Sequence, residues 1–228
     1  MAELILALDL PAARVTPLLD RVPECRWVKV GSILFAEAGP ELVRGLVARG
    51  LAVFLDLKWH DIPNTVAGSV RAAAGLGVSL ATVHILGGRE MMAAAVAAAG
   101  PLDLVGVTVL TSHTQPSYEA AVGRSGVVML EEVVRLAASA RSAGLRGVVC
   151  SPLEVASVKA HLAPGALIVV PGIRRPEDPA GDQARTATPG EAARAGATHL
   201  VVGRPVLAAA DPGMAFRELS LRAAASRP

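Results

Sequence analysis

Short runs of apolar and β-branched residues recur along the 228-residue chain, separated by Ala- and Leu-rich segments with helical spacing. One helical segment spans residues 41–50, and another spans 130–144 and ends at Gly144, a residue type that commonly terminates helices. The apolar runs have the length and composition of buried strands. They occupy residues 4–9, 27–31, 52–58, 81–85, 104–111, 147–150, 167–172 and 199–203.

Strands that alternate with helices are typical of parallel sheets joined by right-handed crossovers. Eight such units close most economically as an α/β (β/α)8 TIM barrel, and we expect one domain over residues 1–228. An open, doubly wound sheet is the alternative, but no GxGxxG motif follows the first strand. The 52% apolar content suffices for a large core, and the 3% aromatic content indicates a core of Ala, Val and Leu.

Charge and composition argue against several classes of protein. The net charge is +2 and the basic residues are scattered, so we expect no nucleic-acid partner. The first residues, "MAELILALDL", do not resemble a signal peptide, and no apolar run approaches the roughly 18 residues of a membrane span, so we expect a cytoplasmic protein. Cys25 and Cys150 lack a CxxC or His-rich partner, which argues against a disulfide framework or a zinc site.

Polar residues end the predicted strands. Active sites of (β/α)8 barrels lie at the carboxyl ends of the strands, so these side chains should converge on one rim. They are Asp9, Lys29, Asp56, Lys58, His84, Thr111, Cys150 and Ser151, with Arg174 and Arg204 after the last two strands. We expect His84 to be a hydrogen-bonded structural residue and Cys150 a buried, inert thiol.

Asp56 and Lys58 should lie on the same face of their strand because side chains alternate with a period of two. A structural ion pair that plugs the barrel is one interpretation. Two observations favour a functional one: only three of the 22 basic residues are lysines, and Asp9, Lys29 and Asp61 add further charge at the same mouth. Neighbouring carboxylates favour the ammonium form, so we expect Lys58 to donate a proton to a carbanion or to stabilise it electrostatically.

Residues 174–188 form a Pro-, Gly- and Asp-rich segment that is too polar to pack and too long for a simple connector. Arg204 follows a strand that ends in Gly203, where backbone N–H groups can approach a phosphate. We expect the segment to be a loop that closes over a phosphate. A solvated surface loop is the alternative.

The segment "FLDLKWHDIPNTV" resembles the signature of the orotidine 5'-phosphate decarboxylase family, although Trp59 replaces the more usual Phe. The resemblance continues through "LALDL", "TVHILGG", "VTVLTS", "VPGIRRPEDPAGDQARTATP" and "HLVVGRP", which are spread over residues 5–205. It implies a lyase of UMP biosynthesis that converts orotidine 5'-phosphate to UMP and CO2 without metal or cofactor.

The resemblance also implies roles for individual residues. Lys29, Asp56, Lys58 and Asp61 would form the catalytic array, with Lys58 protonating C6 of the pyrimidine. The protein would be a homodimer in which Asp61 and Thr65 reach the partner's site. The other implied substrate contacts are Asp9 and Lys29 to the ribose, Thr111 to the pyrimidine, and Arg174, Gln183, Gly203 and Arg204 to the phosphate and its closing loop.

Two other functions stay open. One is a magnesium-dependent decarboxylase or aldolase acting on sugar phosphates, from the group that shares the DxKxxD core. Those enzymes carry a Glu metal ligand where this chain has Lys29, and a cation there would repel Mg²⁺. The other is a non-catalytic, nucleotide-binding barrel.

Overall fold

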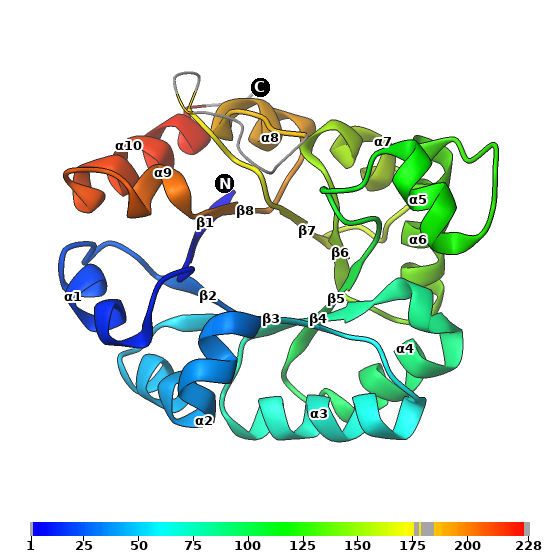
Figure 1. The fold of residues 1–228 in the computed structure, drawn as a ribbon, viewed down its shortest axis with the longest axis horizontal. Helices are drawn as coiled ribbons and strands as arrows, with labels where there is room; N and C mark the ends of the chain where they lie inside the picture. Colours follow the sequence, from blue (N-terminus) through cyan, green and yellow to red (C-terminus); the bar gives the residue numbers. More distant parts are fainter. Residues whose placement is uncertain (1, 176–177, 179–184, 226–228) are drawn as a thin grey trace.

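The computed structural model describes residues 2–175, 178 and 185–225, and it forms a closed barrel of eight parallel strands in sequence order (Figure 1). The strands are β1 (Glu3–Ala7), β2 (Trp27–Gly31), β3 (Ala52–Trp59), β4 (Leu80–His84), β5 (Asp103–Val107), β6 (Gly147–Val149), β7 (Leu167–Val170) and β8 (His199–Val202). Pairing of β1 with β8 closes the barrel. The predicted fold class is confirmed, and each predicted strand overlaps an observed one.

Helices surround the sheet on its outer side (Figure 1). They are α1 (Val15–Asp20), α2 (Ser32–Ala48), α3 (Pro63–Gly75), α4 (Gly88–Ala98), α5 (Gln115–Val122), α6 (Met129–Ser142), α7 (Val155–Lys159), α8 (Pro189–Ala195), α9 (Arg204–Leu207) and α10 (Pro212–Ala224), with short 3₁₀ turns at η1 (Ala12–Arg14), η2 (Ile85–Gly87) and η3 (Pro152–Glu154). The helix predicted at 41–50 begins earlier, at Ser32, and is kinked where Gly39 (φ 63°) precedes Pro40. Gly144 follows α6 with φ 87°, as expected of a residue that ends a helix.

Two apolar clusters stabilise the barrel. The larger one fills the space between the sheet and the helices. The smaller one fills the barrel interior with residues from most of the strands, including Ile5, Phe54, Leu80, Val105 and Val201.

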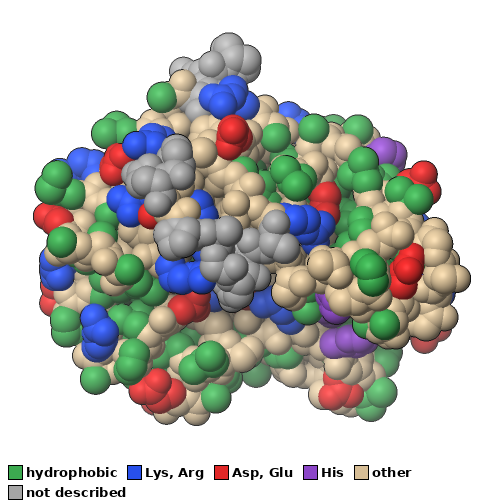
Figure 2. Space-filling view, turned by 45° about the horizontal axis from the view of Figure 1, so that its top comes forward, with side chains coloured by type: hydrophobic (Ala, Val, Ile, Leu, Met, Phe, Trp, Pro, Cys, Tyr) green, Lys and Arg blue, Asp and Glu red, His purple; other side chains and the backbone are tan. Residues whose placement is uncertain are grey.

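The helices in the described ranges include none with the length and apolar character that a membrane span requires. Figure 2 shows basic side chains interspersed with acidic and apolar ones on the face that it presents.

Strands β6 and β7 approach each other closely at Gly147. A Cβ atom added there would lie 1.9 Å from the backbone carbonyl oxygen of Leu167. By contrast, a Cβ on the exposed Gly45 in α2 would meet no atom within 4 Å. The same substitution should therefore have opposite effects at the two positions.

We expect Gly147→Ala to lower the free energy of unfolding by about 3 kcal/mol, because backbone must move to admit the methyl group. Gly45→Ala should raise it by about 0.5–1 kcal/mol, because alanine has the better helix propensity. Urea unfolding at a fixed protein concentration measures both changes. Equal effects of the two substitutions would contradict the packing described here.

Candidate active site

Every second side chain along a strand points into the barrel. This alternation fills the barrel interior with apolar side chains and also places the polar side chains at its mouth. Ile5 and Ala7 belong to the interior cluster, and Asp9 follows two residues later. In β3, Phe54 belongs to the cluster and Asp56 follows two residues later. The interior therefore changes from apolar to charged along the strands, toward their carboxyl ends.

A continuous array at the mouth of the barrel consists of four predicted residues, in the order Asp9, Lys29, Asp56 and Lys58. The Nζ atom of Lys29 lies 3.1 Å from Oδ1 of Asp9 and 3.9 Å from Oδ2 of Asp56. The same Oδ2 accepts a hydrogen bond from Nζ of Lys58 at 2.8 Å. The side chains of Lys29 and Asp56 are 13% and 14% exposed, so this part of the array is largely removed from solvent. Charges alternate along it, so each ammonium group is next to a carboxylate.

Asp56 and Lys58, which were expected on the same face of their strand, are in contact, although the strand is not regular there. Leu55 pairs with Ala81 and Trp59 pairs with Val83, so three residues of β3 lie opposite one residue of β4. Lys58 adopts φ 51° within this bulge, a conformation that non-glycine residues rarely take. A regular period of two is therefore not what brings these two side chains together.

Two residues at the array were missed by sequence reasoning. Thr82 of β4, which is fully buried, accepts a hydrogen bond from the backbone N–H of Lys58 and donates one to Oδ1 of Asp56. Gly31 leaves space for Lys29, since a Cβ there would lie 3.1 Å from its Nζ. The sequence offered one signal for each residue. Thr82 is a polar residue in the otherwise apolar run before His84, and Gly31 stands two residues after Lys29.

In the described part of the chain, no hydrogen bond or ion pair joins Asp61 or Thr65 to the array. Both are exposed, and Asp61 accepts a hydrogen bond from the backbone N–H of Ile62 at 2.6 Å. Among the described residues, no ion pair joins Asp61 to a lysine. The expected four-residue array is thus complete in this chain only as far as Lys29, Asp56 and Lys58.

The residues expected at the phosphate lie after the last two strands, which are paired with each other. Gly203 follows β8, and a Cβ there would lie 3.6 Å from Oδ2 of Asp9, so this glycine borders the array. Arg204 is exposed at the start of α9.

Thr111, which was expected to contact the pyrimidine, is half-buried in the loop between β5 and α5. Gln183 lies outside the described residues.

The described ends of segment 174–188 are paired with each other just after β7. Ile173 and Ala187 form an isolated bridge, and the backbone N–H of Arg174 donates to the carbonyl of Ala187 at 3.0 Å. The Arg174 side chain is buried, and Arg175 forms an ion pair with Asp178 at 2.7 Å. Neither of these two arginines is therefore fully solvated.

The far end of the same segment carries a buried ion pair. Arg185 binds the Glu154 carboxylate, and its guanidinium also donates to the carbonyl of Leu110 at 3.3 Å. Burial raises the pKa of Glu154, while the guanidinium of Arg185 opposes that rise. Arg185 thus joins the segment to the loops after β5 and β6.

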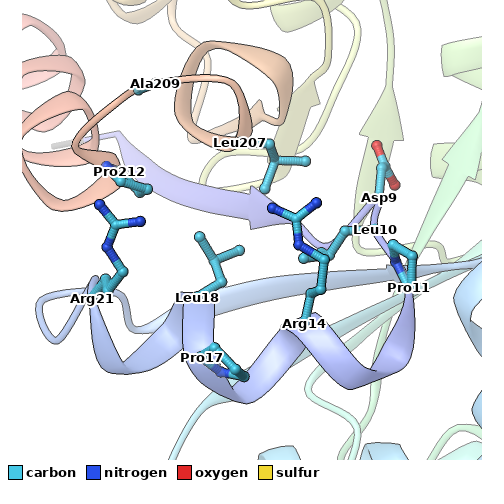
Figure 3. Close-up of a pocket in the computed structure, with 10 residues that line it drawn as sticks. All are labelled: Asp9, Leu10, Pro11, Arg14, Pro17, Leu18, Arg21, Leu207, Ala209 and Pro212. Carbon is cyan, nitrogen blue, oxygen red and sulfur yellow. The ribbon is translucent and has the colours of Figure 1, made fainter.

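A cavity of about 500 Å³ opens over the array, lined by Asp9, Lys29, Asp56 and Lys58 together with residues such as Gly31 and Ile33. A second hollow of about 330 Å³ adjoins it at Asp9 (Figure 3). Figure 3 shows Arg14 extending toward Leu207 of α9 and Arg21 extending toward Pro212 at the start of α10, and Arg21 donates to the carbonyl of Ala210. The larger cavity has room for a nucleotide-sized ligand.

His84 is hydrogen-bonded, as expected. Its Nδ1 accepts a hydrogen bond from the N–H of Leu86, and its ring stacks on His60 with the centroids 5.4 Å apart. Burial, followed by the nearby His60 and Lys58, lowers its pKa to about 4. Burial also raises the pKa of Cys150, which therefore carries a protonated, inert thiol.

The fold and this array define a class of protein: a (β/α)8 barrel with alternating lysines and aspartates around a cavity at the carboxyl ends of its strands. Residues 2–219 match the sequence model of the Orotidine 5'-phosphate decarboxylase / HUMPS family. The chain belongs to this family.

Proteins similar to this chain share nearly its full length. The orotidine 5'-phosphate decarboxylase of Halorhodospira halophila is 50% identical over 98% of this chain and 97% of its own, and that of Anaeromyxobacter dehalogenans is 52% identical over 94% and 95%. The crystal structure of orotidine 5'-phosphate decarboxylase from Lactobacillus acidophilus has a TM-score of 0.87 at 35% identity, covering 98% of this chain and 99% of its own.

The lowered pKa of His84 predicts a pH effect on stability. His84 binds a proton near pH 6.5 when unfolded but only near pH 4 when folded, so acidification between these values favours unfolding. His84→Asn keeps an acceptor for the Leu86 N–H. It should lower the number of protons taken up on unfolding in this window by up to about one, and thus flatten the slope of the unfolding free energy against pH. Urea unfolding from pH 4.5 to 7 measures it. An unchanged slope would contradict the lowered pKa.

Proposed function

We propose that this protein decarboxylates orotidine 5'-phosphate to UMP and CO2, the reaction of de novo pyrimidine biosynthesis. The observation that carries the proposal is the Lys29–Asp56–Lys58 array at the mouth of a barrel whose relatives, about 50% identical, are named for this activity. We place the reaction in the cytoplasm and assign it no metal or cofactor.

In the proposed mechanism the bond between C6 and the carboxylate breaks, and its electron pair remains at C6. The ammonium group of Lys58 donates a proton to that carbon, and the resulting amine regains a proton from water. Asp56, 2.8 Å from Nζ of Lys58, holds the ammonium in place. Lys29 links Asp56 to Asp9, so the negative charge beside the substrate is partly balanced.

Substrate binding is distributed around the cavity. Asp9 and Lys29 bind the ribose hydroxyls and Thr111 contacts the pyrimidine. Gly203 and Arg204 bind the phosphate, together with Arg174 and Gln183 of the 174–188 segment, which we propose closes over it. The position of Gly203 beside Asp9 supports this arrangement, because it brings the phosphate end next to the ribose end. Binding energy gained at the phosphate can then be used at the distant reacting carbon.

A metal-dependent reaction on a sugar phosphate is the second candidate in this family, and the position of Lys29 disfavours it. Its Nζ lies between the carboxylates of Asp9 and Asp56. A divalent cation bound by these two aspartates would therefore have to approach an ammonium group.

We also propose that the protein is a homodimer in which Asp61 and Thr65 complete the partner's site. Three large apolar side chains are exposed just after β2, β3 and β4: Ile33 (88%), Ile62 (66%) and Leu86 (41%). These strands are neighbours in the barrel, and Ile62 is adjacent to Asp61. A second copy that covers this surface would bury the apolar side chains and bring a foreign Asp61 near the array.

Lys58→Ala should lower kcat/KM for orotidine 5'-phosphate by about 10³-fold or more, because the proton donor is lost. Lys159→Ala is the matched control: this lysine is exposed at the end of α7 and should be dispensable. UMP formation, followed by absorbance with and without EDTA, measures the effect. A wild-type protein that forms no UMP, or that needs a metal, would overturn the proposal.

The shared site predicts complementation between inactive variants. Lys58→Ala and Asp61→Ala subunits, allowed to exchange, would form about half mixed dimers, each with one intact site of two, so about a quarter of wild-type activity should return. Native mass spectrometry verifies the exchange. Mixed dimers without activity would show that Asp61 serves its own subunit, while the Lys58 assignment would stand.

A further inference from the structure

We propose that Thr82 is a positioning residue for the decarboxylation, holding Lys58 and Asp56 in their productive arrangement. The inference rests on the proposed function. Its basis is that the hydroxyl of Thr82 contacts both the backbone of the proposed proton donor and the carboxylate that binds this donor.

The bulge in β3 creates the need for such a contact. Asp56, Leu57 and Lys58 lie opposite Thr82 alone, between the Leu55–Ala81 and Trp59–Val83 pairs. Lys58 is thereby displaced from the regular ladder into φ 51°. Its backbone N–H finds an acceptor in Oγ1 of Thr82, at 2.8 Å. The Thr82 side chain on β4 thus takes the place of the backbone carbonyl that would accept from the Lys58 N–H in a regular strand.

Both hydrogen bonds of the Thr82 hydroxyl have a fixed direction, because a backbone N–H can only donate and a carboxylate can only accept. Oγ1 of Thr82 therefore accepts from Lys58, and its own hydrogen is available for Oδ1 of Asp56, 3.1 Å away. The other oxygen of Asp56 accepts from Nζ of Lys58. Backbone of Lys58, hydroxyl of Thr82, carboxylate of Asp56 and ammonium of Lys58 therefore form a closed ring.

Thr82 is a poor choice for packing alone. It is fully buried on an interior position of β4, two residues after Leu80 of the apolar cluster. Valine has nearly the same shape and no hydroxyl that needs partners. Both partners of the hydroxyl belong to the array, which fits a role in setting the orientation of Asp56 and Lys58.

Kinetics separate positioning from binding. Thr82→Val should lower kcat by about 10²-fold, as expected for a misplaced reacting group, while KM and the affinity for UMP change by no more than about threefold. Thr82→Ser, which restores the hydroxyl, should recover most of the activity. Thr82→Ala serves as a second hydroxyl-free variant if the valine variant folds poorly.

Thr108→Val is the matched control. Thr108 is also fully buried, and its hydroxyl donates to the carbonyl of Val149 at 2.9 Å and not to a residue of the array. Loss of this hydroxyl should leave kcat within about threefold of the wild type. If Thr108→Val and Thr82→Val lost kcat equally, the loss would reflect a general effect of removing a buried hydroxyl. That result would overturn the proposal.

A readout independent of turnover uses the three lysines of the chain. Protein labelled with ¹⁵N-lysine gives three backbone amide signals, and Lys58→Arg identifies that of Lys58. Thr82→Val should shift this signal and speed its hydrogen exchange, while those of Lys29 and Lys159 report an intact fold. Thr108→Val should leave all three unchanged.

The outcomes distinguish the two proposals. If the wild type decarboxylates and Thr82→Val retains its kcat or its Lys58 amide protection, only the positioning role is overturned. If the wild type forms no UMP, the proposed function fails and this inference fails with it.

Discussion

The carboxylate of Asp56 is the group on which the mouth of the barrel depends. Its side chain is only 14% exposed, and removing a charge from water is costly unless every oxygen is bound. Lys58 and Thr82 bind one oxygen each, and Lys29 lies 3.9 Å from the oxygen that Lys58 binds. The positions of both lysines, and hence the shape of the cavity over the array, follow from satisfying this one buried charge.

The rest of the barrel makes this arrangement possible. Lys58 adopts an unfavourable backbone conformation, which persists only where the surrounding structure holds it. The regular pairing of β2 with β3 on one side and the buried β4 on the other provide this support. The apolar interior below the array resists deformation, because close-packed cores admit little movement. Strain at the proposed proton donor is thus supported by stability elsewhere in the barrel.

The sequence predicted the architecture well, because apolar periodicity and the order of strands and helices report directly on a parallel barrel. It also placed Asp9, Lys29, Asp56 and Lys58 at one mouth, since carboxyl ends of parallel strands converge. Thr82 could not be predicted in the same way. Its importance comes from a bulge that changes the register between two strands, and register is not visible in a single strand's pattern.

A crystal structure with bound UMP tests the central claim, that Lys58 delivers the proton to C6, most directly. We expect the uracil to lie in the cavity lined by Asp56 and Lys58, with Nζ of Lys58 within about 3–3.5 Å of C6. We also expect the ribose to lie beside Asp9 and Lys29. UMP bound with C6 turned away from Lys58, or bound outside this cavity, would contradict the account.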